Sequence, residues 1–243
     1  MIEKALRYIE DLKEQAMEPK VLEIAGKVYC NKTLKRYDEE KFAEEISAST
    51  LTSMVDYIKN CGEELREHMI IHVESPTQVS LYSGLTQERT REHLFESVAR
   101  VPEFKYDRWY DQERFLIELQ ANFEVTPDLV TLQKVAGNVE AKTTAAYGDD
   151  GVSQKTTIKQ GIASKADVIV PNPVTLCPYR TFLEVEQPES QFVFRIKDEG
   201  GVQFKLVEAE GGMWKNEAMH LIKNYFLSEL KEILADGRIT VIA

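Results

Sequence analysis

The chain has 243 residues, of which 43% are hydrophobic and 29% are charged, as in one large globular domain or two small ones. Its formal net charge of −11 argues against direct binding to duplex DNA, because phosphates are held by clustered cations. Three cysteines without paired spacing indicate a reducing compartment. There is no apolar run of membrane-spanning length and no signal peptide. The sequence therefore predicts a soluble cytoplasmic protein that makes no membrane contact.

The first part of the chain predicts a helix followed by a hairpin. Apolar side chains at three- and four-residue spacing indicate a helix over residues 2–17: Ile2, Leu6, Ile9 and Leu12. Two short β-prone runs then flank Ala25-Gly26, so residues 21–30 are expected to form a hairpin.

Further helices and strands are expected up to residue 83. Asp38 is suited to cap a helix over 38–46, and Ser49 or Thr50 to cap a second helix over 49–60. Two β-rich runs, 68–75 and 78–83, are separated by a turn at Pro76.

Three helices are expected between residues 86 and 137. The segments 86–101 and 111–123 carry helical patterns. The third helix, 126–137, has Thr126 as its cap and Pro127 at its first helical position, and Gly137 is expected to end it.

After Gly137 the sequence becomes β-rich. Two strands are expected over 139–161 around a turn at 148–151, and a phenylalanine-rich hairpin over 191–208. Gly211-Gly212 precedes a long helix over 213–234, and the apolar strand 239–243 is expected at a sheet edge or against a partner subunit.

Together these elements predict an α+β fold rather than a regular βαβ alternation. The N-terminal half, residues 1–137, is expected to be mainly helical with short hairpins. The C-terminal part, 138–243, is expected to be an antiparallel β region closed by a long helix. The two parts form either separate domains or one continuous domain.

No motif in the sequence specifies a catalytic, metal or cofactor site. His68 and His72 lie four apart in a β-prone run, which would separate them by about 13 Å, too far for one metal ion. Cys177 is expected to be a small buried side chain rather than a nucleophile. The glycine pair before the last helix, with Lys215 nearby, could meet an anion, but a turn and a helix start explain it better.

The proline-bracketed stretch around residues 170–195 raises the most specific question. Alternation in the segment 179–187 predicts an edge strand with Glu184 and Glu186 on one face, about 6–7 Å apart. This spacing is compatible with acid–base catalysis, but a solvated face neutralised by neighbouring cations is favoured. We therefore interpret the strand as a binding edge. The residues expected to take part in binding are Tyr179, Arg180, Glu184, Glu186, Arg195 and Lys205.

Five segments, in this order, carry a resemblance: STLTSMVDYIKN, HVESPTQVSLYS, GDDGVSQ, VPNPVTLCPYRTFLEVEQPESQFVFRI and VEAEGGMWKNEA. With them, the chain from about residue 20 onward resembles an uncharacterised family of phage and prophage proteins of low-GC Gram-positive bacteria. It is more loosely similar to the YfdQ-like domain of unknown function. The resemblance implies an early-region role in a temperate phage, inside its host cell, and it carries over no catalytic or ligand residues to this chain.

The favoured function is a non-enzymatic accessory protein of the phage early region, a homo-oligomer that acts by binding. One alternative is a counter-defence protein that sequesters a nucleotide signal or a host protein. A further alternative is a hydrolase that uses Glu184 and Glu186. Direct binding of single-stranded DNA is less favoured than contact with a phage or host protein, because of the net charge.

Overall fold

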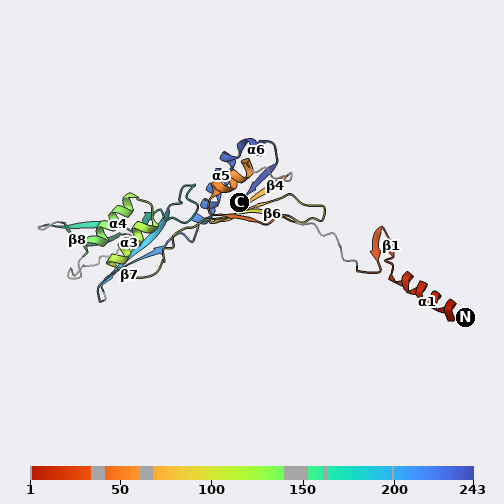
Figure 1. Ribbon diagram of the computed structural model, residues 1–243. Helices are drawn as coiled ribbons and strands as arrows, with labels where there is room; N and C mark the ends of the chain where they lie inside the picture. Colours follow the sequence, from red (N-terminus) through yellow and green to blue (C-terminus); the bar gives the residue numbers. More distant parts are fainter. Residues whose placement is uncertain (1, 34–41, 61–67, 140–152, 161–163, 199) are drawn as a thin grey trace. The chain divides into compact units, whose positions relative to one another are not determined.

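The computed structural model describes residues 2–33, 42–60, 68–139, 153–160, 164–198 and 200–243. The chain forms two compact units, Met1–Phe42 and Ala43–Ala243. Figure 1 shows its helices and strands. Helices follow strands without a regular alternation, and both parallel and antiparallel pairings occur, so the fold is mixed α+β, as predicted.

The first unit contains one helix and one hairpin. They are α1 (Ile2–Met17), β1 (Val21–Ile24) and β2 (Lys27–Cys30). The turn residues Ala25 and Gly26 have φ values of 53° and 73°, and two positive values are what a two-residue hairpin turn of type I′ requires. Both predictions for residues 2–30 are confirmed.

The second unit contains a five-stranded mixed sheet in the order β13-β4-β5-β6-β3. Its strands are β3 (Ile46–Ala48), β4 (Met69–Ser75), β5 (Gln78–Tyr82), β6 (His93–Val98) and β13 (Ile239–Ile242). The three central strands run antiparallel, whereas β13 pairs parallel with β4 and β3 parallel with β6. The C-terminal strand therefore lies at a sheet edge, as predicted.

Three helices lie over one face of this sheet: α2 (Leu51–Asn60), α5 (Trp214–Glu229) and α6 (Lys231–Ala235) (Figure 1). Every second residue of β4 faces them, because side chains alternate along a strand. We call the apolar cluster between helices and sheet the first core. Its most buried members include Leu51, Met54, Ile71, Val73, Val79, Leu81, Ile222 and Phe226.

A four-stranded antiparallel sheet, in the order β10-β11-β12-β7, carries the second core. Its strands are β7 (Tyr110–Asp111), β10 (Val174–Leu176), β11 (Ser190–Asp198) and β12 (Val202–Glu208). The helices α3 (Gln112–Asn122) and α4 (Pro127–Asn138) pack on one face. The cluster between them, which we call the second core, is rich in phenylalanine, and its fully buried members include Phe115, Leu119, Phe192, Phe194, Phe204 and Leu206.

A separate hairpin, β8 (Ser153–Gln160) and β9 (Ser164–Pro171), lies beside α4. The sequence placed a turn at residues 148–151, which lie outside the described residues. In the hairpin that the structure describes, β8 pairs with the following segment 164–171.

The predicted helix starts are confirmed by their capping bonds. The Thr126 hydroxyl accepts from the Leu129 N–H at 3.2 Å, and Pro127 opens α4. At α2, Thr50 rather than Ser49 provides the cap, because its hydroxyl accepts from the Ser53 N–H at 3.3 Å.

The prediction that the N-terminal half is mainly helical is wrong. Residues 93–98, expected within a helix over 86–101, form β6 between β5 and β3. Ile46, expected to end a helix over 38–46, instead begins β3, and Ala43–Glu45 are not helical; residues 38–41 of that expected helix lie outside the described residues. The pairing partners that turn these segments into strands come from other parts of the chain, so tertiary contacts override local propensity.

The C-terminal predictions hold more closely. The phenylalanine-rich hairpin has the expected facing pairs, with Phe194 opposite Leu206 and Ile196 opposite Phe204. The long helix is divided at Leu230 into α5 and α6. Whether the regions on either side of Gly137 are separate domains stays a prediction.

Candidate functional site

Residues 177–189 connect the first core to the second, and we call them the joint. Near its start, the Tyr179 N–H donates to the Asn122 carbonyl at the end of α3 at 2.9 Å. A few residues later, Phe182 is buried in the first core and the Thr181 hydroxyl donates to the Pro76 carbonyl at 2.5 Å. The stretch that carries four of the predicted binding residues, Tyr179, Arg180, Glu184 and Glu186, therefore connects the two cores instead of forming a free edge.

The prediction of an edge strand over 179–187 is wrong. The Gln187 side chain forms hydrogen bonds with backbone N–H and carbonyl groups that, in a strand, would pair with a neighbouring strand. Gln187 is buried. Its amide makes four hydrogen bonds at 2.9 to 3.3 Å, from the N–H groups of Arg180 and Thr181 and to the carbonyls of Phe182 and Val185. The chain therefore folds around one glutamine side chain instead of extending.

Arg180 lies inside the protein. Its Nη1 donates to the Glu208 carboxylate at 2.7 Å and its Nη2 to the Ser190 hydroxyl at 2.5 Å. The guanidinium carbon lies 4.0 Å from the centre of the Trp214 ring. Burial lowers the pKa of the guanidinium, but arginine stays charged at any physiological pH. Arg180 thus links the joint to β12 and to the start of α5.

The two glutamates of the joint have different environments. The Glu184 carboxylate accepts hydrogen bonds from the N–H groups of Leu51 and Thr52, at 2.8 and 3.3 Å, at the start of α2. Glu186 is exposed. Both lie outside any strand, so the predicted arrangement of two carboxylates on one strand face is absent from this described segment.

Glu184→Ala is expected to lower the free energy of unfolding by about 1 kcal/mol. The change removes the acceptor for two N–H groups at a helix N-terminus, where a negative charge is also favourable. Urea unfolding followed by circular dichroism measures the effect. The matched control is Glu186→Ala, whose expected effect is below about 0.5 kcal/mol. Equal effects of the two substitutions would contradict this role for Glu184.

Cys177 is a buried thiol rather than a nucleophile. Its Sγ donates to the Gln187 carbonyl at 3.0 Å. Burial, together with the nearby Glu124 carboxylate, raises the pKa of the thiol to about 12. Because the thiolate is the reactive form, a thiol with this pKa is unreactive near neutral pH.

Two other predicted residues meet on the outer face of the four-stranded sheet, opposite the side covered by α3 and α4. Arg195 on β11 lies directly opposite Lys205 on β12. Like charges at facing positions of a sheet are unfavourable. Lys205 is partly neutralised, because its Nζ lies 2.6 Å from a carboxylate oxygen of Asp107.

Two further residues of this face, Trp109 and Lys197, were not predicted from the sequence. The ammonium groups of Lys197 and Lys205 lie 4.7 and 5.0 Å from the centre of the Trp109 ring, within the range of a cation–π contact. One signal was available in the sequence, since Arg195 and Lys197 alternate with the core residues Phe194 and Ile196. Nothing local placed Trp109 beside them.

A groove of about 460 Å³ adjoins this face beside the N-terminal half of α3. Its lining residues are Glu103, Lys105, Arg108, Trp109, Tyr110, Asp111, Arg114, Glu118 and Gln203. Trp109 belongs both to the groove and to the cationic face, and Gln203 pairs with Lys197 across the two strands. The groove and the outer face of the sheet are therefore continuous.

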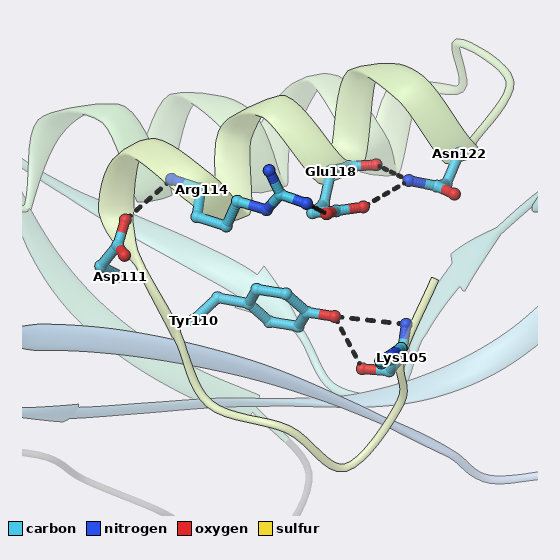
Figure 2. Close-up of polar contacts among 6 residues, drawn as sticks. All are labelled: Lys105, Tyr110, Asp111, Arg114, Glu118 and Asn122. Atoms are coloured by element: carbon cyan, nitrogen blue, oxygen red, sulfur yellow. Dashed lines mark hydrogen bonds and ion pairs between the residues drawn. The ribbon is translucent and has the colours of Figure 1, made fainter. Parts of the chain in front are cut away.

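Figure 2 shows how the α3 wall of the groove is fixed. The Asp111 carboxylate accepts from the Arg114 N–H at 2.8 Å and caps the helix. Glu118 pairs with Arg114 at 2.5 Å and accepts from the Asn122 side chain at 2.8 Å. Glu118 therefore neutralises one lining cation of the groove, Arg114, and Asp111 is engaged as the helix cap.

Tyr110 fixes the chain segment that leads into α3 (Figure 2). Its hydroxyl donates to the Lys105 carbonyl at 3.1 Å and accepts from the Lys105 N–H at 3.2 Å. Burial raises the pKa of the Tyr110 phenol, so it remains a neutral donor. The contact holds Lys105 and the loop that follows it against the sheet.

The N-terminal segment Ile2–Cys30, which we call the arm, presents the largest apolar exposure. Every residue from Ile2 to Cys30 is exposed. Half of the exposed large apolar side chains in the described part of the chain lie in the arm. The ones on α1 follow a helical stripe and include Ile2, Leu6, Ile9 and Leu12, which are 47 to 78% exposed.

Comparison of the chain with protein-family models, with curated proteins and with solved structures finds no match. Among the described residues, no helix has the length and apolar character needed to cross a membrane.

Proposed function

We propose that this protein is a non-enzymatic binding protein that assembles with further copies of itself through the arm. One observation carries the proposal, namely that the arm has regular secondary structure but buries none of its side chains. An isolated helix of this length is marginal in water, and so is an isolated two-stranded hairpin. The arm therefore needs another surface against which to fold.

The charge distribution favours a second copy over a membrane or a nucleic acid. The arm contains five Lys and Arg and six Asp and Glu residues, a net charge of −1, whereas residues 43–243 carry a net charge of −11. Membrane-surface helices and phosphate-binding arms are cationic. A nearly neutral arm with an exposed apolar stripe instead matches a protein surface and adds little repulsion when it approaches an acidic body.

The five-stranded sheet supports the same proposal. Its outermost strands are β13 and β3, and neither has a second strand partner among the described residues. Ile46 and Ile242, on these edge strands, are 42 and 43% exposed. Open edges with exposed apolar side chains favour pairing with another chain, which agrees with the expectation from sequence that strand 239–243 could meet a partner subunit.

The resemblance to phage and prophage proteins gives this proposal a context. Under it, the chain is an accessory protein of the early region of a temperate phage and acts in the host cytoplasm. Self-association is compatible with an additional phage or host protein partner.

Ile9→Glu is expected to weaken self-association about tenfold or more. Ile9 lies in the middle of the exposed apolar stripe, and burying such a side chain contributes roughly 1.5–3 kcal/mol. Size-exclusion chromatography with light scattering at several concentrations measures the change. Gln15→Glu is the matched control, because it adds the same charge to α1 away from the stripe. Equal behaviour of the two variants would contradict an interface on this stripe.

A further inference from the structure

We propose that the groove beside Trp109 and the adjoining cationic face bind a nucleotide phosphate, either free or within a single-stranded nucleic acid. This inference is independent of self-association, because the groove and the cationic face lie entirely within residues 43–243. It rests on three features, the placement of cations, an aromatic surface among them and the size of the groove.

The cations are placed where folding alone does not favour them. Arg195 faces Lys205 directly across β11 and β12, and Lys197 lies two residues further along β11. The only hydrogen bond of the Arg195 guanidinium described in the structure goes to the carbonyl of its neighbour Phe194, at 3.4 Å. Asp107 already compensates Lys205, so the Arg195 guanidinium is the member of this cluster that an anionic ligand would stabilise most.

The aromatic surface comes from Trp109, whose side chain is partly exposed. Nucleic-acid bases stack on aromatic side chains, and neighbouring cations bind the attached phosphates. Trp109 lies within 5.0 Å of two lysine ammonium groups. A base at the indole would therefore have cations within reach of its phosphate.

The groove has a size that fits one nucleotide. Its volume of about 460 Å³ falls inside the range of roughly 300–1,000 Å³ that small-molecule sites occupy. Lys105 and Arg108, both exposed, add cations to its rim. Of the three acidic lining residues, Asp111 caps α3, Glu118 is paired with Arg114, and Glu103 is exposed, so the cations nearest the indole are those of the adjoining face.

The test is a titration of the intact protein with three probes: adenosine 5′-monophosphate, a short oligothymidylate and inorganic phosphate. Calorimetry measures the affinity for each probe. Tryptophan fluorescence follows the environment of Trp109, and the variant Trp109→Phe shows how much of the fluorescence change comes from Trp109 rather than Trp214. The double variant Arg195→Gln, Lys197→Gln is expected to bind about tenfold more weakly or worse, because charge-assisted hydrogen bonds are lost. Lys134→Gln, at an exposed position of α4, is the matched control, and this variant should bind as the parent protein does.

The probes separate the two sources of the ligand. Tighter binding of the monophosphate supports a free nucleotide, and tighter binding of the oligothymidylate supports a single strand. In either case affinity should fall as salt rises. Three results would overturn the proposal: no binding of either base-bearing probe, equal binding of inorganic phosphate and the monophosphate, or undiminished binding by the folded double variant.

Discussion

Phe204→Ala should lower the free energy of unfolding by about 4 kcal/mol, since large-to-small changes of buried phenylalanine typically cost 3–5 kcal/mol. Phe204 is fully buried in the second core. Its ring centre lies 5.2 Å from that of Phe115 and 6.1 Å from that of Phe194. The substitution therefore leaves a cavity between the sheet and α3 and removes two aromatic contacts.

Urea unfolding with circular dichroism measures this loss. Val125→Ala is the matched truncation, because the Val125 side chain is 84% exposed and its expected effect is below about 0.5 kcal/mol. A loss below about 1 kcal/mol for Phe204→Ala would show that the second core is packed differently.

Arg180→Ala should lower the free energy of unfolding by about 3 kcal/mol. Removing one partner of a buried ion pair leaves the other charge without compensation, at a cost of roughly 3–5 kcal/mol. We take the lower value because the Glu208 side chain is 35% exposed. The change also removes the hydrogen bond to Ser190 and the contact with Trp214.

Arg238→Ala is the control, because it also removes an arginine from an ion pair, here with Asp236. The Arg238 and Asp236 side chains are 58 and 65% exposed, and an exposed pair contributes at most about 1 kcal/mol. Since Arg180 connects β12, the joint and α5, its loss should also make the two cores unfold less cooperatively. Tryptophan fluorescence, through Trp214, should then change at lower urea concentration than circular dichroism. Similar losses for the two arginines would contradict the buried role of Arg180.

Elements that depend on nearby residues could be predicted from sequence. The hairpin of β11 and β12 was predicted with its facing pairs, because alternating phenylalanines and a glycine-containing turn specify its register locally. The start of α4 was predicted from Thr126 and Pro127 for the same reason.

Elements that depend on distant partners could not be predicted. β6 has residues compatible with a helix, and its place between β5 and β3 decides its conformation. The joint shows the same limit, since Glu184 bonds to Leu51 and Thr181 to Pro76, contacts between segments far apart in the sequence. Alternating residues in 179–187 suggested a strand, but the Gln187 side chain replaced the partner strand.

The candidate site was predicted in part. Arg195 and Lys205 were selected from sequence, and the structure brings them together. Trp109 was missed because it reaches this face through β7, whose pairing with β12 no local pattern encodes.

The molar mass of the intact protein in solution tests self-association most directly. Light scattering at micromolar concentration and moderate salt should give a multiple of the chain mass of 27.8 kDa, falling toward that mass on dilution or with Ile9→Glu. A constant mass of 27.8 kDa across the concentration range, identical for the parent protein and the variant, would contradict assembly through the arm.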